Sequence, residues 1–327
     1  IENMLKLHLK DLVRFPSDFS TIFNPKERTH GLFVNWRALE QIVINELNWA
    51  MMRKNLQNDV VNALSVTATK ISSGKSTLFI DRPNGKIPVW TRDRRVDAVG
   101  VNITPAHALA SASIPLLFPA IKVDGSYYCD GGVKQNTPLS PVLRLGADKV
   151  LILGIRSEAR EEKIFTKQQF ISSNNVEDEK YPGVLFLLGK MIDSVMLDRL
   201  DYDLQRLDGF NMLLRDGKKA FGDEFETEIN KTAEKMRGAK YRSIQTVVIR
   251  PSRDLGEMAG EFIDVLQSYL DFAGKWAFRN LTSQSSLGQT DILSYLLFDG
   301  RLAAALIELG KADADAARDK LIDFFKD

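Results

Sequence analysis

The sequence predicts an α/β protein in which a sheet-containing core is followed by a largely helical C-terminal part. Two apolar, β-branched segments at 63–71 and 74–80 are typical of paired strands. Further on, strand, helix and strand patterns follow one another with short links as far as residue 155, which is the order of an α/β core. Beyond about residue 157 helical patterns dominate, with one more strand-like segment at 244–250.

Length and composition are those of a globular protein and exclude several classes. The 327 residues are 44% apolar, and 44 basic against 43 acidic side chains leave a formal charge of +1. That balance argues against a chain-wide electrostatic attraction to nucleic acid. The single cysteine, Cys129, excludes an internal disulfide, and no apolar run reaches the roughly 18 residues that span a bilayer. The first residue is Ile1 rather than methionine, so we expect a fragment, a processed product or a sequence whose beginning is missing.

The first predicted elements are a helix over 38–56 and a hairpin whose strands are 63–71 and 74–80. The helix has apolar residues at helical spacing on one face: Leu39, Ile42, Val43 and Leu47. The hairpin turn contains the letters GKST, which suggest a phosphate-binding loop. Such a loop needs a glycine five residues before Gly74, and Thr69 stands there. A plain hairpin turn is favoured, and a nucleotide-dependent switch is the alternative.

A second hairpin is predicted around Asp124 and Gly125. This pair lies between alternating segments and is a strong signal for a two-residue turn. Alternation along the strand that follows places Cys129 on one side and both Tyr128 and Asp130 on the other.

Two helices flank this hairpin. The segment 105–113 is rich in small residues, which suit close packing on a sheet. The second helix has Asn136 or Thr137 as its cap, Pro138 in its first turn and Gly146 at its end.

The rest of the chain supplies further strands and helices. The segment 149–155 is almost continuously apolar, as in a strand covered on both faces. A long helical pattern occupies 184–214, and the strand at 244–250 is expected to pack on the first core. We therefore expect two parts, a sheet-containing part over 1–156 and a mostly helical extension over 157–327.

Asp130, with the glycines that follow it, is the candidate site. The carboxylate stands at the end of a strand, where α/β proteins place their sites. Gly131 and Gly132 allow a tight turn and close approach of backbone or ligand, and Asn136 completes the loop. A carboxylate fixed there can act as a general base toward a hydroxyl. The alternative is a turn aspartate that caps only its own loop.

His107 and Cys129 are predicted to be structural. His8, His30 and His107 are widely spread and have no metal-site spacing, so neither a metal nor a cofactor is expected. His107 is predicted to pack within its helix, and Cys129 to be a small buried residue. A nucleophilic Cys129 assisted by His107 is disfavoured, because strand alternation turns Cys129 away from Asp130.

Residues 107–155 resemble the patatin-like phospholipase family of the bacterial type. The likeness rests on an ordered set: Ala-Ser before Ile-Pro, then Phe-Pro, Asp-Gly-Gly, Asn-x-Pro-Leu and Leu-Gly-Ala-Asp. The resemblance implies a three-layer α/β sandwich around a mainly parallel sheet, with a helical C-terminal extension. It also implies hydrolysis of acyl esters in phospholipids or related lipids by a Ser-Asp dyad, in which Asp130 matches the aspartate that accepts the serine proton.

The sequence departs from this family at the nucleophile. The family's serine lies in Gly-x-Ser-x-Gly, and neither this motif nor a glycine-rich oxyanion loop occurs in the 327 residues. We expect both upstream of Ile1, so that 1–156 is the C-terminal portion of a catalytic domain and this chain alone is inactive. Ser111 and Ser113 lie in a helix without elbow glycines and are not expected to be the nucleophile. The alternative is an inactive patatin-like module that binds lipid or another partner.

The expected partners follow from the resemblance. They are a phospholipid or another acyl-ester lipid, a transient membrane surface, a second copy in a homodimer, and the missing N-terminal segment as a separate chain. No nucleic acid is expected. The location expected is the cytoplasm or the periphery of a membrane.

Overall fold

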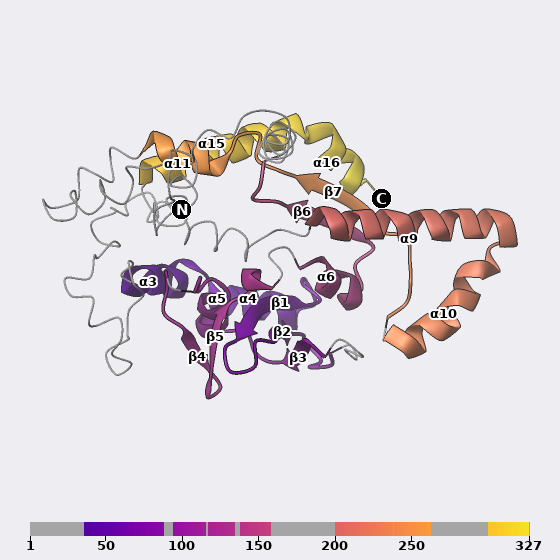
Figure 1. Ribbon diagram of the computed structural model, residues 1–327, viewed down its shortest axis with the longest axis horizontal. Coiled ribbons are helices and arrows are strands. Elements are labelled where there is room, and N and C mark those ends of the chain that lie inside the picture. Colours follow the sequence, from indigo (N-terminus) through magenta and orange to yellow (C-terminus); the bar gives the residue numbers. More distant parts are fainter. Residues whose placement is uncertain are drawn as a thin grey trace, which may run out of the picture.

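The computed structural model describes residues 36–87, 94–115, 117–134, 138–157, 200–237, 239–262 and 300–326 (Figure 1). The predicted α/β class and the helical C-terminal part are confirmed. Seven strands form a five-stranded and a two-stranded sheet within the described residues, and helices accompany both.

The larger sheet is mixed, with the strand order β3-β2-β1-β5-β4. Its strands are β1 (Leu64–Lys70), β2 (Ser76–Asp81), β3 (Val96–Gly100), β4 (Ile121–Val123) and β5 (Ser126–Asp130). Only β2 and β3 pair in parallel, whereas β1–β2, β1–β5 and β4–β5 are antiparallel. The expectation of a mainly parallel sheet is therefore corrected for this part, because two hairpins contribute antiparallel pairs.

Both predicted hairpins are confirmed. The turn between β1 and β2 contains Gly74 at φ +65°. Of the GKST letters, Gly74 and Lys75 lie in this turn and Ser76 and Thr77 begin β2, so the motif leads into a strand rather than a helix. Asp124 and Gly125 have φ angles of +45° and +79°, the positive values that a type I′ turn requires. Glycine and aspartate tolerate this backbone, which explains the second hairpin.

One face of the five-stranded sheet packs against α5 (Pro105–Ser111), which contacts β1, β4 and β5. The buried core there consists of Ala68, Phe79, Ala110, Val123 and Tyr128. Along β5, Tyr128 and Asp130 are buried and Cys129 between them is half-buried, as the predicted alternation requires. The small residues of α5 thus allow the close approach to the sheet that the sequence suggested.

The helix predicted over 38–56 is two helices, α3 (Trp36–Glu46) and α4 (Trp49–Gln57). Asn48 ends the regular pattern, because its side chain accepts a hydrogen bond from the backbone N–H of Met51 and caps α4. Leu47, predicted on the apolar face, lies in the break and is 46% exposed. The apolar residues keep their helical spacing across this cap, so the sequence pattern alone did not reveal the break between the two helices.

After the candidate site, the chain forms α6 (Leu139–Leu145) and β6 (Lys149–Leu153). Gly146, at φ +110°, ends α6 as predicted. The prediction that β6 is covered on both faces is wrong, because its residues alternate between buried and exposed and Leu153 is 69% exposed. An apolar sequence alone did not distinguish one covered face from two.

The strand predicted at 244–250 is β7 (Gln245–Ile249), which pairs in parallel with β6. These two strands form their own sheet among the described residues. Its core combines residues from both sides of the predicted boundary at 156/157: Leu139, Val150, Ile152, Leu200, Leu207 and Ile244. The boundary itself stays a prediction.

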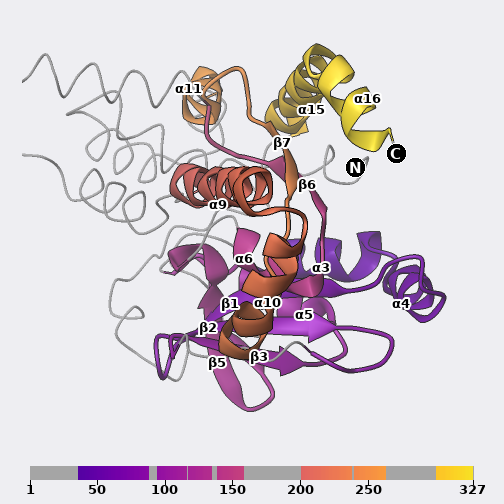
Figure 2. The ribbon, with the colours of Figure 1, turned by 90° about the vertical axis from the view of Figure 1, so that its right-hand side faces the viewer.

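The C-terminal helices are α9 (Leu200–Phe221), α10 (Glu224–Arg237), α11 (Leu255–Glu261), α15 (Gly300–Ala316) and α16 (Arg318–Phe325). Helix α9 contains the last part of the pattern predicted at 184–214, whose residues 184–199 lie outside the described ranges. Figures 1 and 2 show β1–β5 gathered with α3, α4, α5 and α6, and β6–β7 with α9, α11, α15 and α16. None of the described helices has the length and apolar character needed to cross a membrane.

Candidate active site

Asp130 is the last residue of β5 and lies opposite Ala68 of β1 in the sheet. Its residue surface is only 9% exposed. A carboxylate at such a place loses most of its hydration, so it must be held by other groups or change its protonation.

Three hydrogen bonds hold the backbone and side chain of Asp130. The Oδ1 atom accepts from the backbone N–H of Gly132 at 2.6 Å. The Asp130 N–H donates to the Ser113 carbonyl at 2.8 Å, and the Asp130 carbonyl accepts from Thr69 Oγ1 at 2.9 Å. The residue is thereby tied to β1, to the end of α5 and to its own turn, which fixes the direction of the carboxylate.

Burial raises the pKa of Asp130 to about 6, and the hydrogen bond from Gly132 acts in the opposite direction. Within the described part of the chain, no salt bridge involves this carboxylate. Its second oxygen, Oδ2, has no hydrogen-bond partner among the described residues. The group is therefore ionised near neutral pH, yet basic enough to accept a proton from a reacting hydroxyl.

Gly131 and Gly132 are both buried and begin a short 3-10 turn, Gly131–Val133. A Cβ on Gly131 would lie 2.2 Å from the carbonyl oxygen of Thr67, which belongs to the centre of β1. The predicted close approach of backbone is thus found at Gly131. Gly132 has a different use, since it supplies the N–H that binds the Asp130 carboxylate.

Asn136, the third predicted member of the loop, lies outside the described residues. The two serines nearest in sequence hydrogen-bond to backbone carbonyls. Ser111 Oγ donates to Thr67 O at 2.7 Å, and Ser113 Oγ donates to Leu109 O at 2.6 Å. Ser113 is fully buried. Neither hydroxyl donates to Asp130, in agreement with the expectation that neither serine is its reaction partner.

Cys129 is half-buried rather than buried. The pKa of its thiol is raised, first by burial and then by the charge of Asp130. Both effects favour the unreactive thiol over the thiolate. Cys129 is therefore a poor nucleophile in this setting.

His107 is buried, as predicted, and packs edge-on against Phe79 with ring centroids 4.6 Å apart. Burial lowers its pKa, while the carboxylates of Asp124 and Asp81 act against this shift. A metal ion is commonly held by a group of three or more histidine, cysteine, aspartate or glutamate side chains. Among the described residues, no such group that could hold a metal ion is found.

Sequence reasoning missed two residues that shape the site, Thr67 and Thr69. Both belong to β1, more than sixty residues before Asp130, and their side chains appeared only as β-branched strand formers. Their contacts with Gly131 and Asp130 arise from the pairing of β1 with β5. No local pattern could have indicated that register.

The family model described as Patatin-like phospholipase matches residues 3–143. The matched range includes β1 to β5, the Asp130 turn and most of α6. A search of curated proteins finds no match for the chain.

Proposed function

We propose that Asp130 is the general base of a lipid acyl hydrolase, because residues 3–143 match the model of the patatin-like phospholipase family. The family is one of lipid acyl hydrolases, so the substrates are acyl esters of lipids. The observation that carries the proposal is the buried, three-way anchored carboxylate with a pKa of about 6.

The proposed reaction proceeds in two steps. Asp130 accepts the proton of a serine hydroxyl while the serine oxygen attacks the ester carbonyl. The tetrahedral intermediate expels the alcohol, which leaves with the proton from Asp130, and an acyl-serine remains. Asp130 then takes a proton from water, the hydroxide attacks the acyl-serine, and the released serine oxygen recovers the proton as the fatty acid departs.

Within this proposal, the two carboxylate oxygens of Asp130 have different tasks. Oδ1 is held by the N–H of Gly132, so it sets the orientation of the group. Oδ2 is the proton acceptor, since no described residue donates to it. We place the serine outside these 327 residues, because they contain no Gly-x-Ser-x-Gly.

The test compares the natural full-length protein with its Asp130→Asn variant. The matched control is Cys129→Ala, because Cys129 is the neighbouring residue and its side chain lies on the opposite side of the strand. Hydrolysis of a phospholipid should fall about 10²- to 10⁴-fold in Asp130→Asn, the usual contribution of a general base. Cys129→Ala should retain activity. Asp130→Asn with native-like turnover and an unchanged fold, measured by circular dichroism, would show that another group is the base.

The absence of Gly-x-Ser-x-Gly favours a second candidate, a patatin-like module that binds lipid without hydrolysing it. In that case Asp130 serves only its own turn. Binding of phospholipid vesicles without turnover in the natural full-length protein, unchanged in Asp130→Asn, would support this candidate. Labelling of the full-length protein by a fluorophosphonate would reject it.

A further inference from the structure

Helix α9 presents three large apolar side chains to solvent. Tyr202, Met212 and Leu213 are 61%, 54% and 52% exposed. Leu200 and Leu207, on the opposite face of the helix, are buried in the core that includes β6. Figure 2 views α9 close to end-on, with β6 and β7 beside it. Single apolar residues on a surface are ordinary, so the spacing of these three along the helix decides whether they matter.

The exposed face of α9 carries a seam with the spacing of a coiled coil. Six exposed residues follow one another at steps of 4, 3, 4, 3 and 4: Tyr202, Arg206, Gly209, Leu213, Asp216 and Ala220. In a helix of 3.6 residues per turn, all six lie within roughly 40° of one line along its surface. A second helix can pack along such a line, with the side chains of the two helices interleaved.

This seam is complementary to itself when two copies of α9 run antiparallel. A two-fold axis at residue 211 brings the first seam residue opposite the last, the second opposite the fifth, and the third opposite the fourth. The layers are then Tyr202 with Ala220, Arg206 with Asp216, and Gly209 with Leu213 of the second copy. Each layer joins a large side chain to a small one, or a cation to an anion. Because the contact is reciprocal, every layer occurs twice.

Gly209 provides the space that Leu213 of a second copy needs. Gly209 is exposed, and a Cβ there would meet nothing within 4 Å. Glycine inside a helix lowers its stability, so close approach of another backbone or side chain is a physical reason for its presence. An alanine would also leave room, as Ala220 does opposite Tyr202.

Arg206 and Asp216 determine the direction of the pairing. Within the described part of the chain, Arg206 lies 5.9 Å from the centre of the Tyr202 ring, and Asp216 pairs with its neighbour Arg215. That ion pair is 65% and 55% exposed, so it is weak and Asp216 can exchange it for another cation. In a parallel pair of helices, Arg206 would face Arg206 and Asp216 would face Asp216. Such like-charge contacts are unfavourable, and the antiparallel pair avoids them.

We propose that α9 is the interface of a homodimer, in which two copies pack antiparallel along this seam. Met212 flanks the seam next to the two-fold axis, so Met212 of the second copy covers it. The second copy is the occupant that the seam fits, because size and charge match in all three layers. Helix α9 lies outside residues 3–143, and the inference does not depend on the role of Asp130.

The first test is sedimentation equilibrium of the full chain at rising concentration. The mass should increase from 36.8 kDa toward twice that value. Arg206→Asp and Asp216→Arg each place like charges in two layers, so each should weaken association at least about tenfold. The double variant restores opposite charges and should associate within about threefold of the native chain. Circular dichroism checks that every variant keeps its helices.

The matched control for these variants is Asp208→Arg. It makes the same charge change as Asp216→Arg, on an exposed residue of α9 that lies outside the seam. Association of this variant should equal that of the native chain.

The second test determines the direction of the helices by cross-linking in a Cys129→Ala background, which removes the single native cysteine. Met212→Cys should form dimers with a short bismaleimide, because the two copies of residue 212 meet near the axis. Gln205→Cys lies on the same flank of the seam and should not, because its two copies are roughly 21 Å apart in the antiparallel pair.

Four outcomes would each overturn the proposal. They are a native chain that stays monomeric at its highest soluble concentration, single charge variants that associate as well as the native chain, a double variant that associates no better than the single ones, and cross-linking as strong at Gln205→Cys as at Met212→Cys. The first of these would assign the seam to a different protein partner.

Discussion

The backbone of Gly131 lies directly against the carbonyl of Thr67, so that a Cβ on Gly131 would be 2.2 Å from that oxygen. The same oxygen accepts the hydroxyl hydrogen of Ser111 from α5. The Thr67 carbonyl of β1 therefore contacts both α5, through Ser111, and the turn that follows Asp130, through Gly131. A substitution that displaces this carbonyl should also displace the candidate base.

Gly131→Ala should damage the site through this contact. The nearest neighbour of the added Cβ is backbone, which cannot rotate away, so the turn must shift, at a cost of about 1–3 kcal/mol in stability. Activity of the full-length protein should fall at least about tenfold, because a small misplacement of a catalytic group is costly. Thermal unfolding and turnover are the measurements.

Gly209→Ala is the matched control for this substitution. Gly209 lies inside α9 and its Cβ would meet nothing within 4 Å. Removing a helical glycine should therefore stabilise the protein by up to about 1 kcal/mol and leave turnover unchanged. If both alanine variants behaved alike, the Gly131–Thr67 contact would have no special role.

The pKa of Asp130 sets the pH dependence of the proposed reaction. The base must be ionised, and burial holds the pKa of its carboxyl at about 6. The value of kcat/KM should therefore rise with pH through about 6 and level off above it, since kcat/KM reports the free enzyme. An acid limb near the ordinary aspartate pKa of about 4 would contradict this assignment.

The same shift has a consequence of opposite sign for stability. The folded pKa of Asp130 is raised above its unfolded value, so this group's contribution is fully present below about pH 4 and is lost as pH rises through about 6. The loss is on the order of 2–3 kcal/mol. Asp130→Asn removes the titration and can still accept from the Gly132 N–H.

Urea unfolding of native protein and Asp130→Asn between about pH 4 and pH 7 measures this effect. The variant should become progressively more stable than the native protein across that range, while its activity is lost. A constant difference between the two proteins would mean that the carboxyl of Asp130 titrates equally in the folded and unfolded states.

Local signals in the sequence predicted most of what lies close to Asp130. The Asp124–Gly125 turn and the alternation along β5 together placed the carboxylate at a strand end, on the side opposite Cys129. They did not indicate that the side of Asp130 is the buried one. Positive φ angles and a two-residue side-chain period are properties of a few adjacent residues, so they can be read from the sequence.

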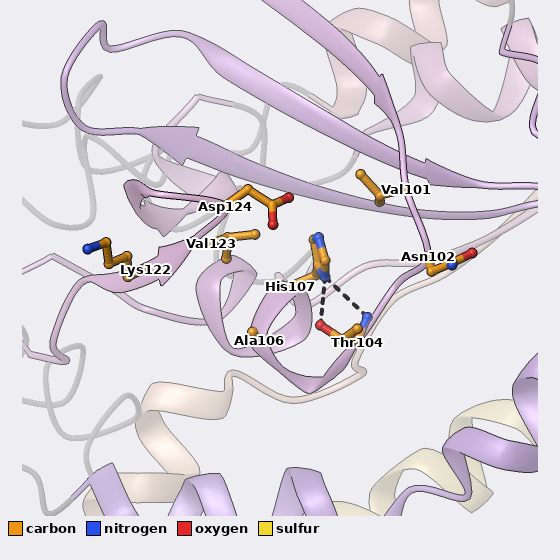
Figure 3. A pocket seen from close by; sticks show the side chains of 8 residues that line it. All are labelled: Val101, Asn102, Thr104, Ala106, His107, Lys122, Val123 and Asp124. Carbon is orange, nitrogen blue, oxygen red and sulfur yellow. Dashed lines mark hydrogen bonds between the residues drawn. The ribbon is translucent and has the colours of Figure 1, made fainter.

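Features that depend on distant pairing were beyond such signals. The exposed face of β6 depends on what packs against it, which apolar spacing does not reveal. The Asn48 cap that divides one predicted helix is local, and apolar spacing that continued across it concealed it. Thr104 and His107 have the spacing of a capping box, so the sequence could have indicated that Nδ1 of His107 accepts from the Thr104 N–H (Figure 3).

Thr69 is expected to position the base through its bond to the Asp130 carbonyl. Both partners are buried, so Thr69→Val should cost about 1–2 kcal/mol, whereas Thr69→Ser keeps the hydroxyl and should cost less. A looser turn admits water to Asp130, so its pKa should fall toward the ordinary value and the acid limb of kcat/KM should move to lower pH. A purely structural role would lower stability without moving that limb.

The ion pair of Arg53 in α4 with the buried Asp81 of β2 should matter more for stability than an exposed ion pair at the edge of the same sheet. Asp81 is 3% exposed. Its carboxylate accepts from the two terminal guanidinium nitrogens of Arg53, Nη1 at 3.0 Å and Nη2 at 2.9 Å, and from the backbone N–H of Ile103 at 2.8 Å. Arg53→Met leaves this carboxylate buried with a single donor from the Ile103 backbone, so unfolding free energy should fall by about 2–3 kcal/mol.

The control is Lys75→Met, which breaks an ion pair of similar length with Asp97. Both of its side chains are 40% or more exposed, so solvent screens the attraction and the loss should stay below about 1 kcal/mol. The same variant tests the alternative role of the GKST turn, because ATP affinity that disappears in Lys75→Met would point to a nucleotide site. Equal losses of stability in both variants would show that burial of Asp81 does not set the strength of the Arg53 pair.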